Sequence, residues 1–293
     1  MKHVRRMPDT LRPAWAVLLL MTFMSGFVEA KETPYYVMAP DGTVTVQTVS
    51  QLTGQLVDPN PDARRNGAML LQHVDYSESS QIISPLVRLL DDPEESVRNQ
   101  AAETLAHIGA NAVPALLDVI KAQGTTNGRH DTSVRLQRLA VETLGALAWQ
   151  SEAAKQALLD IVQNPRIHTV VRYSAFGGLG HLGTGAPGVA PVLIDLIRRA
   201  NEDLSLRQAA IMTLEALGPQ PETIEALGQL LSDSDVHIRQ SAAYALRSFG
   251  PAAKVVLPQL QAARFDADSE VRLSSEATIK DMTAVKQSSD VSH

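Results

Sequence analysis

The sequence of 293 residues contains no cysteine. Disulfide bonds, cysteine-ligated zinc, a thiol nucleophile and a lipid-anchored lipoprotein cysteine are therefore excluded together. A chain without cysteine suits an oxidising compartment, because it needs no pairing chemistry there.

Basic residues are in the minority. The chain has 26 Lys and Arg against 32 Asp and Glu, which gives a net charge of −6. Nucleic acids and anionic membranes are bound through clustered basic charge. We therefore expect neither as a partner of this protein.

A hydrophobic run long enough to span a membrane is also missing. The longest run, residues 15–28, has about 14 residues, whereas a spanning helix needs roughly 20. Four basic residues precede this run, and residues 28–30 (Val-Glu-Ala) suit a cleavage site. We predict that residues 1–30 are a secretory signal peptide cleaved after Ala30, so that the mature protein is periplasmic or otherwise extracytoplasmic, without membrane contact. An uncleaved anchor is the alternative.

The chain does contain one pattern in seven copies. Each copy has an aliphatic residue, then in most copies an Arg, then a pair of small residues, a Leu and another apolar residue. The clearest copy includes Val97, Arg98, Ala101 and Leu105. Successive anchors are 34, 39, 35, 35, 32 and 33 residues apart, which is the spacing of a repeat array. The anchors are Arg64, Arg98, Gln137, Arg172, Arg207, Arg239 and Arg272.

Helical periodicity explains the pattern. Counted from the anchor at 100° per residue, positions −1, +3, +7 and +10 lie on one apolar stripe. Four copies have Gly at +11, where a helix end needs a left-handed residue. A second apolar helix, often with Pro near its start, precedes each stripe. Each unit is therefore helix, turn, helix, and only residues 43–49 alternate weakly like a strand.

These residues resemble the HEAT-repeat family, in particular the short repeats first associated with phycobilisome lyases. The resemblance implies an all-α fold, a right-handed α-solenoid of about seven two-helix repeats over residues 47–283. Residues 31–46 would form an extended lead-in, and residues 284–293 a disordered tail.

The resemblance also implies a ladder of Asp and Arg side chains between repeats, since an Asp stands six residues before several anchors. We expect the ladder to be interrupted at repeats four and five, where Arg166 and Asn201 stand at the Asp position. The predicted ladder residues are Asp58, Arg64, Asp92, Arg98, Asp233, Arg239, Asp266 and Arg272.

In this family the second helices line the concave side of the array. Positions +5 and +9 of these helices point away from the apolar stripe and form the candidate partner-binding groove, with an acidic character that favours a basic or neutral segment. The candidates are His73, Glu103, His107, Glu142, His181, Met212 and Tyr244.

Catalytic signals are weak. Some HEAT-repeat hydroxylases hold iron with His-Glu dipeptides, and this sequence has none. The residues 178–183 match a dinucleotide-binding pattern by letter, but they lie in a helical repeat rather than between a strand and a helix. The chain also has no Gly-x-Ser-x-Gly turn. We therefore expect no catalytic residue, metal or cofactor.

The preferred interpretation is an exported scaffold or adaptor that binds a protein or peptide partner along its concave face, without catalysis of its own. One alternative is a lyase- or hydroxylase-like enzyme, or enzyme subunit, that uses the groove histidines. The other is a structural component of an envelope complex, whose first helices make the contacts around Arg198 and Arg199. The oligomeric state stays open.

Overall fold

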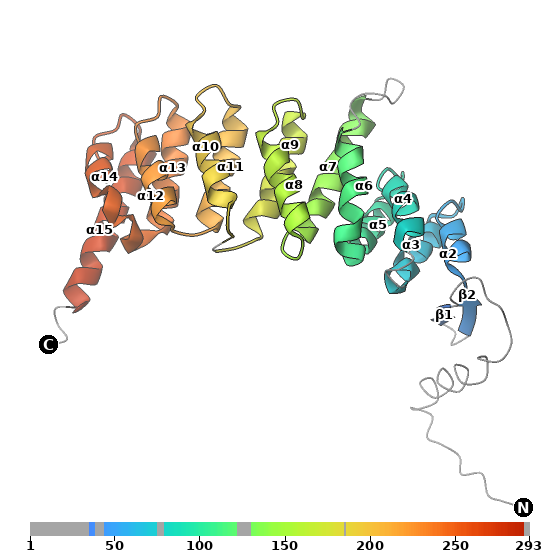
Figure 1. The fold of residues 1–293 in the computed structure, drawn as a ribbon. Coiled ribbons are helices and arrows are strands. Elements are labelled where there is room, and N and C mark those ends of the chain that lie inside the picture. Colours follow the sequence, from blue (N-terminus) through green and yellow to red (C-terminus); the bar gives the residue numbers. More distant parts are fainter. Residues whose placement is uncertain (1–34, 39–43, 75–78, 122–129, 185, 290–293) are drawn as a thin grey trace, which may run out of the picture. The chain divides into compact units, whose positions relative to one another are not determined.

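The computed structural model describes residues 35–38, 44–74, 79–121, 130–184 and 186–289 (Figure 1). The predicted signal segment 1–30 lies outside the described residues and stays a prediction. Among the described residues, no helix combines the length and the hydropathy needed to cross a membrane.

The described chain forms seven helix pairs (Figure 1). The predicted all-α solenoid class, with about seven two-helix repeats, is confirmed. The first helices are α2 (Val49–Gln55), α4 (Ser79–Leu89), α6 (Val113–Lys121), α8 (Glu152–Gln163), α10 (Val189–Arg198), α12 (Pro221–Leu230) and α14 (Leu257–Ala263). The second helices are α3 (Pro61–Leu70), α5 (Glu95–Ile108), α7 (His130–Leu147), α9 (Thr169–Gly180), α11 (Leu204–Ala216), α13 (Val236–Ser248) and α15 (Ser269–Ser289). Three 3-10 segments complete the set: η2 (Leu71–His73), η4 (Gly109–Ala112) and η5 (Gly250–Val256).

A small antiparallel hairpin precedes the helices. Strand β1 (Tyr35–Met38) pairs with β2 (Val44–Gln47), with Tyr35 opposite Gln47 and Met38 opposite Val44. The weak alternation at 43–49 thus corresponds to a strand, while its partner strand was not foreseen. At the other end, α15 continues to Ser289, into the segment 284–293 for which we predicted a disordered tail.

The chain divides into two compact units, residues 1–104 and 105–293, with the division inside α5. In the first unit, α2 packs against α3 and α4. In the second unit, consecutive first helices from α6 to α14 contact one another, and so do consecutive second helices from α7 to α15 (Figure 1). The second unit is therefore a two-layer stack in which one layer consists of second helices.

The apolar stripe builds the core of each pair. Its position +7 is a fully buried leucine in every repeat from the second to the sixth, which removes five large side chains from water. These residues are Leu105, Leu144, Leu179, Leu214 and Leu246. At +11, four glycines end the second helix with positive φ angles of 53–88°, as the pattern predicts.

The turn within each pair sets where the second helix begins. The residue four before the anchor is the N-cap: Asp203, for example, accepts from the backbone N–H of Ser205 and Leu206. The Asp six before the anchor instead accepts from the N–H two residues on, as Asp233 does from Asp235 at 2.9 Å. Capping and ladder formation are thus divided between two positions of the same turn.

The anchor arginine links one repeat to the next. Arg64 forms two hydrogen bonds with the Asp92 carboxylate, at 2.7 and 2.9 Å, and Arg239 forms two with Asp266, at 2.9 and 3.1 Å. Anchors also donate to the backbone carbonyl of the Asp in their own turn; the pairs are Arg64 with Asp58, Arg98 with Asp92, Arg239 with Asp233, and Arg272 with Asp266.

The predicted interruption at repeats four and five does not occur between them. Arg172 binds both carboxylate oxygens of Glu202 at 3.0 Å, one residue beyond Asn201. The extra methylene of Glu compensates for the shift of one residue. Arg172 and Arg207 also donate to the carbonyls of Val162 and Ile197, at the ends of the preceding first helices.

Candidate second-helix face

The exposed surface of α9, α11 and α13 is the candidate site. The apolar stripe turns one side of each second helix toward the first helices, which leaves positions −2, +1, +5, +8 and +9 on the opposite side and +2 at its edge. Neighbouring second helices pack on both flanks, since α11 contacts α9 and α13. Positions −2, +1, +2, +5 and +9 of these three helices are here called the second-helix face, and position +8, with Glu215 on α11 and Arg247 on α13, borders it.

A hollow of about 530 Å³ lies on the second-helix face. Tyr173 of α9 and Met212 of α11 contribute its largest exposed side chains, with exposed fractions of 50% and 62%. Its volume is within the range of sites that take a small ligand or a few side chains. The hollow is lined by Thr169, Val170, Tyr173, Ser205, Gln208, Ala209, Met212 and Ser241.

Large apolar side chains are unusually accessible on this layer. Tyr244 of α13 is 62% exposed and Leu273 of α15 is 59% exposed, in addition to Tyr173 and Met212. Each second helix from α9 to α15 thus presents at least one large hydrophobic side chain to solvent. A row of exposed aromatic and Met side chains is typical of a protein-binding surface.

The predicted groove residues are all exposed, and they are divided between the two compact units. His73 and Glu103 belong to the first compact unit, whereas His107, Glu142 and His181 belong to the second. Only Met212 lines the hollow, and Tyr244 follows on the next second helix. The assignment of the whole set to one partner stays a prediction.

The acidic character expected for the groove is weakened by local pairing. Glu142 forms an ion pair with Arg138 of the same helix, at 3.2 Å, so its charge is compensated. Glu103 accepts from the side-chain amide of Gln100 at 3.3 Å. The hollow itself has no charged residue in its lining.

Sequence reasoning missed Val170, Tyr173 and Gln208, which stand at positions −2 and +1. The predicted groove comprised +5 and +9 alone, although both missed positions lie within the same exposed sector of the helix. Extending the repeat alignment to them would have identified the hollow, because Tyr173 is an aromatic residue at a position facing away from the stripe.

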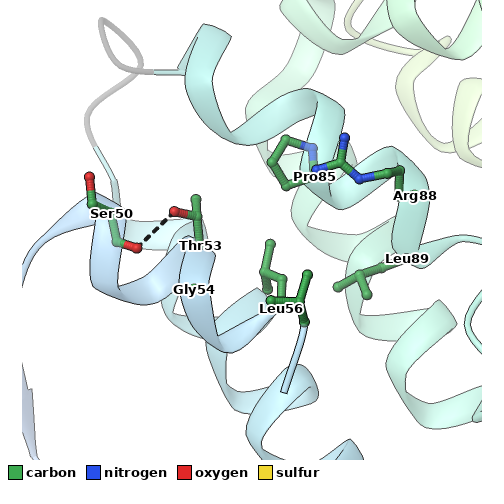
Figure 2. A pocket seen from close by; sticks show the side chains of 8 residues that line it. Ser50, Thr53, Gly54, Leu56, Pro85, Arg88 and Leu89 are labelled. Carbon is green, nitrogen blue, oxygen red and sulfur yellow. Dashed lines mark hydrogen bonds between the residues drawn. The ribbon is translucent and has the colours of Figure 1, made fainter. Parts of the chain in front are cut away.

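Two further hollows lie on first helices. One, in the first unit, is bounded by α2 and α4 and has a volume of about 530 Å³ (Figure 2). Leu56 and Leu89 stand on its two sides, and Thr53 Oγ1 donates to the Ser50 carbonyl at 3.0 Å. The other, of about 540 Å³ between α10 and α12, has a charged lining that includes Arg198, Glu222 and Glu225.

Possible metal ligands do not gather within the described ranges. No group of three or more His, Asp or Glu side chains there is placed to hold a metal ion. The three histidines at position +9 stand singly in the first, second and fourth repeats.

The match to a family model decides the classification. The HEAT-repeat model matches residues 49–126 and 191–280, which together exceed half of the chain. The chain belongs to the HEAT-repeat family. This HEAT-repeat protein is 25% identical over 198 residues to the uncharacterized phycocyanin operon protein Z of Pseudanabaena tenuis, across 66% of the chain and 90% of that protein.

Solved structures with similar folds include enzymes and a chain named Kap121p. Human deoxyhypusine hydroxylase in complex with glycerol has 18% identity and a TM-score of 0.38, over 80% of this chain and 84% of that one. The CpcE–CpcF complex of phycocyanin lyase from Nostoc sp. PCC7120 has 18% identity and a TM-score of 0.36, over 85% and 100%. Kap121p has 14% identity and a TM-score of 0.48, over 80% and 29%.

These comparisons correct one prediction. We expected a chain without catalysis of its own, and the comparisons contradict this expectation, because the chain aligns with phycocyanin operon protein Z over 90% of that protein. A HEAT-repeat fold is compatible with an enzyme or an enzyme subunit as well as with a scaffold.

Proposed function

We propose that this HEAT-repeat protein binds a protein or peptide partner on the second-helix face of α9, α11 and α13. The observation that supports the proposal is the hollow between Tyr173 and Met212, which is flanked by further exposed apolar side chains. Burying such side chains against a partner releases roughly 25 cal/mol per Å² of apolar surface. A stack of helices supplies a long, rigid surface for many such contacts.

The proposal is tested by co-purification from intact cells. The chain carries a C-terminal tag, partners are crosslinked in place, and the captured proteins are identified by mass spectrometry. Met212→Lys, which places a charge in the hollow, should abolish capture of the specific partner. Val255→Lys is the matched control, because Val255 is 63% exposed and lies in η5, outside the second-helix face. Equal capture by both variants would refute the proposal.

A second candidate is that the bound partner is a protein substrate, and that this chain is an enzyme or enzyme subunit of the lyase type. The similarity to phycocyanin operon protein Z over 90% of that protein supports this candidate. The intact mass of the captured partner, compared between cells with and without this chain, tests it. A covalent mass change that depends on the chain would support catalysis, and identical masses would speak against it.

We further propose that the protein is exported. The charged N-terminus, the short apolar run and the cleavage site within residues 1–30 support this. N-terminal sequencing of the protein from the extracytoplasmic fraction should begin at Lys31. A protein that retains residues 1–30 would instead indicate an uncleaved anchor.

A further inference from the structure

The lining of the hollow on the second-helix face is free of formal charge, and charged side chains border the face at position +8, with Glu215 and Arg247. Five positions on each of three helices give fifteen residues, and none of them is Asp, Glu, Lys or Arg. The fifteen are Val170, Tyr173, Ser174, Gly177, His181, Ser205, Gln208, Ala209, Met212, Ala216, His237, Gln240, Ser241, Tyr244 and Ser248.

Charged residues occupy the same positions on both neighbouring second helices, α7 and α15. On α7 the same positions hold the Arg138–Glu142 ion pair, and on α15 they hold Glu270 and Asp281. The neutral zone is therefore limited to α9, α11 and α13, where the hollow lies. Neutrality is a property of this site and not of the repeat.

Gly177 interrupts the row of large side chains on the second-helix face. It stands at position +5 of α9, where α11 has Met212 and α13 has Tyr244. A Cβ at Gly177 would have no atom within 4 Å, so helix packing does not require a glycine here. A glycine in a helix interior is also less favourable than an alanine, because more backbone freedom is lost. At the α9 end of this row, the backbone of Gly177 is therefore exposed and leaves a gap between the large side chains, one turn from Tyr173.

We infer that the second-helix face binds an uncharged peptide segment, and that a bulky apolar side chain of this segment enters the gap above Gly177, beside Tyr173 and Met212. This inference rests on the proposed function and names the class of partner. A charged side chain would lose hydration in a hollow whose lining offers no opposite charge. Apolar and aromatic groups instead gain contact with the Tyr ring and the adaptable Met side chain.

The surrounding side chains suit the backbone of such a segment. Gln208 and Ser205 line the hollow beside Met212, and Ser241 lines it from α13. Amide and hydroxyl groups both donate and accept hydrogen bonds, so they can pair with peptide N–H and C=O groups without any charge. The face therefore combines apolar contacts with neutral hydrogen-bonding groups.

A phage-displayed library of random dodecapeptides tests the inference. The library is panned on the folded full chain, after depletion on the bare support. We expect enriched peptides with no net charge and at least one Leu, Ile, Met, Phe or Trp. A synthetic peptide of the winning sequence should bind with a Kd that changes less than about twofold between about 50 and 500 mM NaCl.

Two variants of the protein then test where the peptide binds. Gly177→Leu should weaken its binding at least about tenfold, while the thermal midpoint of the protein stays equal or rises. Gly54→Leu is the matched control, because Gly54 is an exposed helical glycine of α2, and a Cβ there would also have no atom within 4 Å. It should leave peptide binding unchanged.

The outcomes separate the inference from the proposed function. Enriched peptides that are charged, salt-sensitive and lost on Met212→Lys would overturn the inference and leave the binding face in place. Peptides that bind the Met212→Lys and Gly177→Leu variants as well as the original chain would overturn both. If no peptide is enriched over the depleted library, the inference that the partner is an uncharged peptide segment is wrong. The co-purification experiment alone would then decide the proposed function.

Discussion

Gly145 of α7 and Gly178 of α9 bring the backbones of two neighbouring second helices into direct contact. A Cβ built on Gly178 would lie 2.5 Å from the Cα of Gly145, and one built on Gly145 would lie 2.9 Å from the Cα of Gly178. Neither helix can move away from the other without opening the core that Leu144 and Leu179 fill. Glycine at both positions is therefore a packing requirement.

Gly178→Ala should destabilise the protein by about 1–3 kcal/mol, because the added methyl group would collide with the Gly145 backbone and crowd the Leu158 side chain. Gly177→Ala, one residue away, should stabilise it by about 1 kcal/mol through helix propensity. Urea unfolding followed by circular dichroism measures both. Equal effects of the two variants would mean that α7 and α9 are further apart than described.

Arg172→Gln should lower the free energy of unfolding by about 2–3 kcal/mol, because it leaves the Glu202 carboxylate, only 12% exposed, without its cation. Arg199→Gln is the control: Arg199 pairs with Asp195 at the surface, and such pairs contribute less than about 1 kcal/mol. The double variant Arg172→Gln/Glu202→Gln should recover part of the loss. Additive single effects would show that the two side chains do not interact.

Acid should destabilise the array through its ladder carboxylates. Hydrogen bonds from Arg172 and Arg239 lower the pKa of Glu202 and Asp266. Burial of Asp92 acts in the opposite direction, yet the hydrogen bond from Arg64 and the backbone N–H of Glu94 keep its pKa below the usual value. The folded state therefore binds fewer protons than the unfolded chain near these pKa values.

The stabilisation from these groups is complete above about pH 5, above the unfolded carboxyl pKa values. It should be lost progressively as the pH falls below about 4, through the folded pKa values. Urea unfolding between about pH 3 and 7 measures the slope, and Glu202→Gln should make it shallower. A slope that the variant leaves unchanged would assign the acid sensitivity to other groups.

Ser275→Ala should raise the free energy of unfolding by about 1 kcal/mol, because removing an unsatisfied buried polar group relieves its desolvation penalty. The Ser275 side chain is fully buried in α15, and its hydroxyl has no hydrogen-bond partner among the residues that the structure describes. Thr278→Val is the contrast, because the Thr278 hydroxyl donates to the Ser274 carbonyl at 2.7 Å and its loss should bring no gain. Thermal unfolding of the two variants compares them, and a lower midpoint for Ser275→Ala would contradict the prediction.

The repeated pattern allowed the helix pairs to be predicted, because the same few positions are buried in each copy. The stripe and the terminal glycines depend on local periodicity, which a sequence displays directly. The hairpin partner Tyr35–Met38 has no such periodicity and was missed. Short strands are specified by their pairing, and a single run of four residues does not display it.

The surface chemistry was harder to predict, because it depends on neighbours in space. Glu142 is an acidic groove residue by position, but Arg138 beside it compensates its charge. Gly177 and Gly178 are adjacent in sequence, but only the second meets another backbone. Likewise, Glu202 replaces the missing Asp at position 201 because a longer side chain reaches the same guanidinium.

Gln137 stands where the other six repeats have an arginine, and its side-chain amide donates to the Ile120 carbonyl within its own repeat. Repeats four to seven are instead joined in sequence by Arg172–Glu202, Arg207–Asp233 and Arg239–Asp266. Local opening of such an array follows its weakest interface. The end of α6 is thus held by a neutral amide where the ends of α8 and α10 are held by guanidinium groups, so the amide hydrogens at the end of α6 should exchange ahead of those at the ends of α8 and α10.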